Sequence, residues 1–185
     1  GGVVTDLRGA PCPVAKTGPG ERYMRLRLLV ALVALGCAAA AREGHAGTQD
    51  TPAMAQFITD LIDTLHDYGG IGLAAPQVGE SVRLLVLEIP AGRNRYGEMK
   101  GLPLTICANP EIEVVDPATA GYWEGCLSVP GMRGLVPRYT KLRYRGFDPK
   151  GEPIDRTVDG FHARVVQHEV DHLHGILYPM RIRDL

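Results

Sequence analysis

The segment that most constrains this chain is His168-Glu169-Val170-Asp171-His172, which places two histidines four positions apart. On an α-helix, residues at i and i+4 lie on one face, so both imidazoles can reach a single metal ion. Glu169 would lie close enough to exchange a proton with a metal-held water without being a ligand itself. The segment therefore indicates a metal site and hydrolytic chemistry, with a chance pairing of two histidines as the alternative.

The sequence around this segment predicts a helix that begins near Asp159 and ends at Gly175. Its apolar residues recur mostly at spacings of three to five and are Val158, Phe161, Val165, Val166, Val170 and Leu173. Such spacing is typical of a helix with one apolar face, and glycine is common just beyond a helix end. We therefore expect both histidines on a largely buried helix, sheltered from bulk water.

The chain before this helix favours an α+β fold. A first helix is expected from Thr51 and Pro52 to just before Gly69, and it carries an apolar stripe. The stripe consists of Met54, Phe57, Ile58, Leu61, Ile62 and Leu65. Residues 82–89 predict a buried strand, and residues 91–101 predict a polar loop. Short strands are expected at 104–107, 112–115, 120–123 and 142–147. Further strand is expected near Val136, and a turn at 149–151. We predict short antiparallel strands around a central metal-binding helix, with an N-terminal helix before them.

Residues 1–46 differ in character from the rest of the chain. Residues 24–41 combine a basic start, a short apolar run and small residues, which is the outline of a secretory signal. The apolar run is too short to span a bilayer. We interpret residues 1–46 as an atypical segment, disordered or non-native, and residues 47–185 as the functional domain. The net charge of −1 shows no basic excess, so neither a nucleic-acid nor a membrane partner is expected.

Two histidines leave a metal short of ligands, and Cys126 is the strongest candidate for a third. It lies in a turn-like stretch after an expected strand, and its thiolate is a soft donor that suits zinc or ferrous iron beside imidazoles. Three protein ligands would leave one position for water, as in a catalytic site. The alternative is a buried, inert thiol, which is the interpretation we give Cys12, Cys37 and Cys107.

Three segments together resemble peptide deformylase. They read Gly-Ile-Gly-Leu-Ala-Ala-Pro-Gln-Val-Gly at 70–79, Glu-Gly-Cys-Leu-Ser at 124–128 and Gln-His-Glu-Val-Asp-His-Leu-His-Gly at 167–175. The resemblance extends from about Gly47 to the end of the chain. It implies a metallohydrolase that removes the formyl group from the N-terminal formyl-methionine of new polypeptides and releases formate. It also implies a bacterial cytoplasmic monomer that works near the ribosome, with an organelle as the alternative location.

The resemblance also implies roles for individual residues. Cys126, His168 and His172 would bind ferrous iron, with zinc, nickel or cobalt as replacements. Glu169 would be the acid and base, and Gln77 with the backbone N–H of Leu127 would form the oxyanion hole. The residues implied for substrate binding are Ile71, Tyr122, Phe161 and Val165 around the methionine side chain, with Gly72 and Gly125 beside the peptide backbone. Glu124 and Arg138 would form a salt bridge that braces the loop of Cys126. Core packing and ordinary surface charges are the alternatives.

Two rival functions stay open at this point. Another zinc peptidase with the same helical motif would usually take its third ligand downstream, where only His174 and Asp184 remain. An inactive or non-catalytic metal-binding homologue is the second rival, because no Gly-Asp-Pro-x-Leu segment of the family type precedes Thr51. Asp171 could orient a ligand ring or be a solvated charge of the helix.

Overall fold

The computed structural model describes residues 52–94 and 97–182 of the chain. The elements in chain order are α2 (Pro52–Asp67), β1 (Gly72–Ala74), the 3₁₀ helix η3 (Ala75–Val78), β2 (Leu84–Ile89), β3 (Gly92–Asn94), β4 (Gly97–Met99), β5 (Leu102–Cys126), β6 (Val129–Phe147), β7 (Pro153–Asp159), α3 (Gly160–Leu173) and the 3₁₀ helix η4 (Tyr178–Arg181). The predictions for residues 1–46 and for Thr51 fall outside the described residues.

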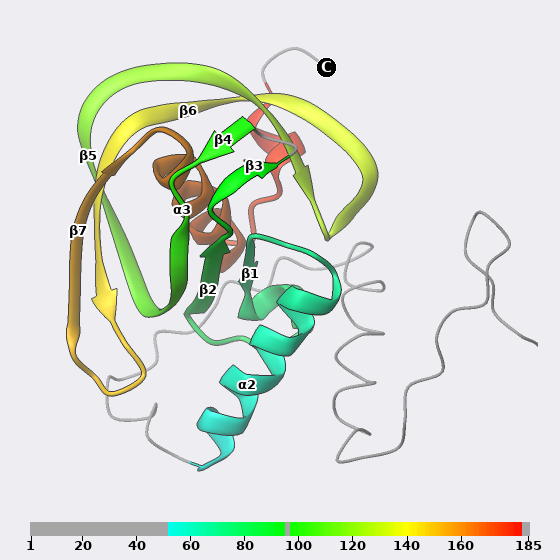
Figure 1. Ribbon diagram of the computed structural model, residues 1–185, viewed down its shortest axis with the longest axis vertical. Helices are drawn as coiled ribbons and strands as arrows, with labels where there is room; N and C mark the ends of the chain where they lie inside the picture. The colour runs from blue at the N-terminus through cyan, green and yellow to red at the C-terminus, as the bar shows by residue number, and fades with distance from the viewer. Residues whose placement is uncertain (1–51, 95–96, 183–185) are drawn as a thin grey trace, which may run out of the picture.

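The strands form one five-stranded sheet in the order β1-β2-β5-β6-β7, and every neighbouring pair is antiparallel. In Figure 1, β5 and β6 run side by side as long curved strands that bend over α3. Within the part of the chain that the structure describes, strands β3 and β4 pair only with each other. The expected α+β class with antiparallel strands is therefore confirmed.

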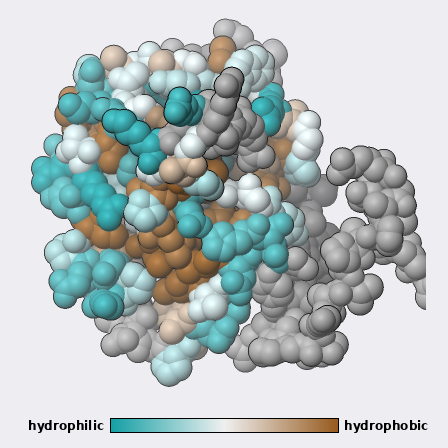
Figure 2. All heavy atoms as spheres, in the orientation of Figure 1, coloured by the Kyte–Doolittle hydropathy of each residue, from teal (hydrophilic) through white to brown (hydrophobic). Residues whose placement is uncertain are grey.

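Strand β2 separates two cores, because its side chains alternate between the faces of the sheet. Leu85 and Leu87 point to the core that α3 covers, whereas Leu84 and Val86 point to the core that α2 covers. All four are nearly inaccessible to solvent. The prediction of a buried strand at 82–89 is confirmed, with observed bounds of Leu84–Ile89. In the view of Figure 2, apolar side chains gather between α2 and β5 and are ringed by polar ones.

Both expected helices are present at nearly the expected bounds. On α2, Ile58, Leu61 and Leu65 are buried, and the rest of the predicted stripe packs partly buried against the same core. Helix α3 runs from Gly160 to Leu173, and Gly175 adopts a left-handed φ of 72° just beyond it. Glycine adopts this conformation at little cost, which makes it a suitable residue at a helix end.

The expected short strands are wrong in length, because β5 and β6 are continuous over 25 and 19 residues. The gaps between the expected strands contain irregularities inside β5. The register with β6 shifts between Ala108 and Glu111, where Asn109 has a φ of 48°, and shifts again around Asp116. Such bulges bend a strand without ending it.

Two further expectations are corrected. Residues 91–101, predicted as a polar loop, contain the paired strands β3 and β4. Val158, assigned to the helical stripe, lies in β7 and pairs with Leu142 of β6. Strand β7 is an edge strand whose side chains are mostly exposed. Its apolar residues Ile154 and Val158 share one face with the polar Arg156 between them, so the strand lacks a clear apolar alternation.

Candidate metal centre

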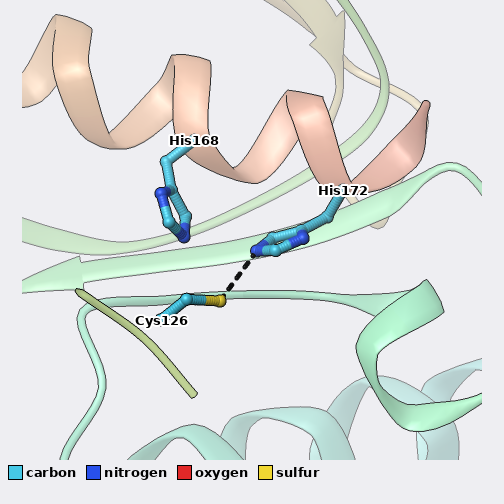
Figure 3. A group of neighbouring side chains, drawn as sticks. All are labelled: Cys126, His168 and His172. Carbon is cyan, nitrogen blue, oxygen red and sulfur yellow. Dashed lines mark hydrogen bonds between the residues drawn. The ribbon is translucent and has the colours of Figure 1, made fainter. Parts of the chain in front are cut away.

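Helix α3 and the end of β5 bring three possible ligands together. His168 and His172 project from one face of α3 toward Cys126, the last residue of β5 (Figure 3). One ligand atom from each residue lies within 4.8 Å of the other two. The Sγ of Cys126 is 3.3 Å from Nε2 of His172. The three residues selected from the sequence therefore meet at one point.

Glu124 fixes the orientation of the His168 ring. Nδ1 of His168 donates to Oε2 of Glu124 over 2.9 Å, so the ring carries its proton on Nδ1 and turns Nε2 toward Cys126. Arg138 donates to both oxygens of Glu124, from Nε at 2.8 Å and from Nη2 at 2.9 Å. Burial alone would raise the pKa of the Glu124 carboxyl, but the hydrogen bonds from Arg138 and His168 lower it to about 2. The predicted pair of Glu124 and Arg138 is present, and it is buried rather than on the surface.

Asp171 and Arg181 extend this network to the C-terminal 3₁₀ helix η4. Asp171 accepts from Nη1 of Arg138 at 2.6 Å, and both of its oxygens accept from Arg181, at 2.6 and 3.1 Å. The ring of Tyr178 stacks on that of His168 with the centroids 6.5 Å apart. Asp171 is thus neither a solvated charge nor a direct partner of a ligand ring. No motif of the sequence pointed to Tyr178 or Arg181, because both follow the helix at irregular spacing.

Glu169 lies beside the three possible ligands and is almost fully buried. Among the described residues, its Oε2 is one of only two buried side-chain oxygen or nitrogen atoms without a hydrogen-bond partner. Burial raises the pKa of the Glu169 carboxyl to about 7, against the opposing charge of His168. A carboxyl of this kind can exist with or without its proton near neutral pH, which suits proton transfer.

Gln77 is held by its oxygen and presents its nitrogen to the site. Oε1 accepts from the backbone N–H of Ala74 at 2.8 Å, which leaves Nε2 to face Oγ of Ser128 at 3.1 Å and Sγ of Cys126 at 3.7 Å. The side chain is only 4% exposed. Gln77 is therefore a buried donor rather than a solvated loop amide.

The residues present fit a divalent metal ion. The donor set is one thiolate sulfur and two imidazole nitrogens, the combination that zinc and ferrous iron accept. Burial lowers the pKa of His168, but its hydrogen bonds with Cys126 and Glu124 outweigh this effect and raise the pKa to about 10. Burial and the charges of His168 and Arg138 hold the pKa of His172 well below its usual value. A metal ion would replace the proton that His168 shares with Cys126, whereas His172, which stays neutral, already offers a free nitrogen.

A cavity of about 780 Å³ opens onto this centre. Of the residues predicted to bind substrate, Ile71, Gly72, Gly125, Phe161 and Val165 line it, and so do Gln77 and Leu127. Phe161 and Val165 also pack against the core under α3, so lining the cavity and packing in the core do not exclude each other.

Tyr122 departs from the expectation, because it is not among the lining residues. Arg164 lies over its ring instead, with the guanidinium carbon 4.4 Å from the ring centroid and 4.6 Å from that of Phe161. Arg164 lines the cavity itself, and no motif of the sequence pointed to it.

Comparison with known proteins decides the family. The profile of the family described as Polypeptide deformylase matches residues 41–185. The chain belongs to this family. Peptide deformylase 1 of Nitrosomonas europaea is 53% identical over 135 residues, which cover 73% of this chain and 76% of that relative. Peptide deformylase 2 of Ralstonia nicotianae is 52% identical over 134 residues, 72% of this chain and 75% of the relative.

Solved deformylases share the fold. The class I type b peptide deformylase of Acinetobacter baumannii with Met-Ala-Ser bound is 34% identical, with a TM-score of 0.69 over 92% of this chain and 97% of that one. The deformylase of Thermotoga maritima is 34% identical, with a TM-score of 0.66 over 77% of this chain and 88% of that one. Within the described part of this deformylase family member, no helix is long and apolar enough to cross a membrane.

Proposed function

We propose that this chain, as a peptide deformylase, removes the formyl group from formyl-methionyl N-termini of new polypeptides through a centre made of Cys126, His168, His172 and Glu169. The observation that carries the proposal is the convergence of one thiol and two imidazoles beside a buried carboxyl at the end of a cavity. Membership of the family establishes the reaction class. The roles of the individual residues are our proposal.

The three ligands would hold ferrous iron, with zinc, nickel or cobalt as replacements, because a thiolate beside two imidazoles suits these softer cations. An ion bound there supplies Lewis acidity toward water and toward the formyl oxygen. Glu124 keeps the His168 ring in the orientation in which Nε2 can bind.

Glu169 would take a proton from the attacking water and later give it to the leaving amine. Its carboxyl lies next to the ligands, and its raised pKa suits both directions of transfer. Negative charge develops on the formyl oxygen as its carbon becomes tetrahedral. Nε2 of Gln77 and the backbone N–H of Leu127 would stabilise that oxygen, and the loss of one such donor typically slows a reaction by about 10²–10³-fold.

The position of β1 suggests how the peptide would bind. Within the described sheet β1 is an edge strand that pairs only with β2, and it lies beside the cavity. An extended peptide could pair with this edge near Ile71, with its methionine side chain against Ile71, Phe161 and Val165. Tyr122 would act indirectly, through the stacked Arg164.

Two observations weigh against the rival functions. An internal peptidase of the same motif would need its third ligand downstream, whereas Cys126 supplies it upstream and His174 is no part of the group. The side chains that we propose as metal ligands, as acid and as oxyanion donor lie together at one site, which supports an enzyme over a merely metal-binding homologue. We further propose a cytoplasmic monomer that acts on chains near the ribosome; its bacterial relatives support this location over an organelle.

The test is formate release from formyl-Met-Ala-Ser by anaerobically prepared, iron-loaded protein. We expect Glu169→Gln to keep bound metal and lose turnover by about 10²–10⁴-fold, because it removes the proton carrier but no ligand. Glu113→Gln is the matched control, since Glu113 is an exposed carboxylate paired with Arg145 and should keep full turnover.

Cys126→Ala should lose both metal and turnover. Formate release by Glu169→Gln at the rate of the unmodified protein would refute the role of Glu169. Unchanged metal content in Cys126→Ala would refute the ligand set.

A further inference from the structure

Gly72 of β1 packs directly against the side chain of Glu169. A Cβ atom at position 72 would lie 2.3 Å from Oε1, 2.6 Å from Cδ and 2.7 Å from Cγ of Glu169. Non-bonded carbon atoms in proteins rest about 3.5–4.0 Å apart, so no side chain fits here while Glu169 keeps its position. Gly72 is not among the residues with positive φ, so its backbone conformation does not call for glycine.

Neither partner can easily move away. Gly72 lies in a strand that pairs with β2, opposite Leu87, and Leu73 beside it is fully buried. Glu169 is 4% exposed, and the close approach involves Cγ and Cδ as well as the end of the side chain. Its Oε2 has no hydrogen-bond partner among the described residues. No hydrogen bond of the described residues fixes this oxygen, so packing of Oε1, Cδ and Cγ against Gly72 limits where the side chain can lie.

We infer that Gly72 is a positioning residue. Because it has no side chain, the Glu169 carboxylate can lie against β1, where it can exchange protons with the substrate and water. This inference rests on the proposed role of Glu169. It adds to the expectation from the family resemblance, which assigned Gly72 to the peptide backbone. The motif at 168–172 and the glycine-rich segment at 70–79 would then act together. The motif carries the Glu169 carboxylate, and Gly72 of the glycine-rich segment leaves the space in which that carboxylate lies.

The experiment compares Gly72→Ala, Glu169→Asp and the double variant, each loaded with cobalt. In Gly72→Ala the added methyl displaces the carboxylate, so kcat should fall about 100-fold while KM changes less than about threefold. Bound cobalt and its absorption spectrum should not change, because no ligand moves. Aspartate is shorter than glutamate by one methylene, so in Glu169→Asp the carboxylate lies farther from position 72. In the Glu169→Asp background, Gly72→Ala should therefore cost less than about threefold in kcat.

Gly121→Ala is the matched control. It adds the same methyl to a glycine of β5, where the nearest atom is Cγ of Leu135 at 3.3 Å, and it should leave kcat within about twofold of the unmodified protein. If Gly72→Ala does not fold, the double variant carries the test, since it should melt and turn over like Glu169→Asp.

The possible failures are distinct. Full turnover in Gly72→Ala, together with an inactive Glu169→Gln, overturns the inference and leaves the proposed function standing. A rise in KM that Glu169→Asp does not relieve overturns it in favour of a role in peptide binding. Turnover retained in Glu169→Gln removes the proposed acid and base, and the inference with it.

Discussion

At the scale of single residues, Cys107 and Cys126 show how surroundings separate two similar thiols. Cys126 borders the cavity and faces His172. Cys107 is completely buried in the core under α3, where burial raises the pKa of its thiol from 9.0 to about 12. A thiol that remains protonated is a poor nucleophile and a poor metal ligand. The sequence prediction of an inert Cys107 agrees with this environment, while Cys12 and Cys37 lie outside the described residues.

Cys107 should make stability depend on pH under alkaline conditions. Its pKa is higher in the folded state than in the unfolded state, so its contribution is complete below pH 9.0 and is lost as the pH rises toward about 12. Urea unfolding should therefore show the unmodified protein losing stability relative to Cys107→Ala between about pH 8 and about pH 10.5. A constant difference between the two proteins over this range would contradict the raised pKa.

The candidate site was largely predictable at this scale, since Cys126, His168, Glu169, His172 and Gln77 all lie in short motifs. A motif identifies chemistry because ligand types and helical spacing are local properties. It does not identify Tyr178 or Arg181, which reach the site only through the path of the chain after α3. Nor does it reveal that Glu169 and Gly72 share one space, since only the packing of α3 on β1 brings them together.

At the scale of elements, η4 is tied to α3 by the pair of Arg181 and Asp171. The same aspartate receives Arg138, which holds Glu124, which in turn orients His168. A change in η4 is thus connected to a possible metal ligand by a continuous series of charged hydrogen bonds. Such bonds fix geometry when their partners are buried, as most of these are.

Arg181→Ala should therefore weaken metal binding although Arg181 touches no ligand. We expect zinc affinity to fall by about three- to tenfold, less than the roughly 10–100-fold typical of a direct hydrogen-bond partner of a ligand. The free energy of unfolding should fall by about 1 kcal/mol, because Arg181 is partly exposed. Competition with a chromogenic chelator measures the affinity, and chemical denaturation measures the stability.

Arg143→Ala is the control for Arg181→Ala. It removes an arginine of similar exposure, which pairs with the more exposed Asp155 between β6 and β7, and among the described residues no hydrogen bond leads from this pair to the ligands. Zinc affinity should therefore stay unchanged in this variant. Equal affinities in Arg143→Ala and Arg181→Ala would show that η4 does not support the metal centre.

The secondary structure was predictable where burial follows a simple period. Helix α2, helix α3 and strand β2 have one or two faces wholly committed to a core, so their apolar residues repeat regularly. Strand β5 does not, because bulges near Asn109 and Asp116 reset its alternation and polar residues there resemble turns. Strand β7 was missed because an exposed edge strand imposes little pattern on its sequence.

At the scale of the whole molecule, stability should depend on β2 more than on any surface strand. Leu87 is fully buried and belongs to the core that supports α3, whereas Leu104 of β5 is 38% exposed. Leu87→Ala should cost about 2–5 kcal/mol of unfolding free energy, because it removes buried surface and leaves a cavity. Leu104→Ala should cost less than about 1 kcal/mol. Denaturant titration of both variants tests this, and equal losses would contradict the arrangement of the cores.

The meeting of Cys126 with His168 and His172 has a consequence for the chain as a polymer. One partner ends the long strand β5 and the others lie on α3, with β6 and β7 between them. An ion held by all three would close that stretch into a loop, much as a disulfide does, and would lower the conformational entropy of the unfolded chain where it remained bound. The metal centre would then cross-link the chain as well as take part in catalysis, so the same three side chains would contribute to stability and to the reaction.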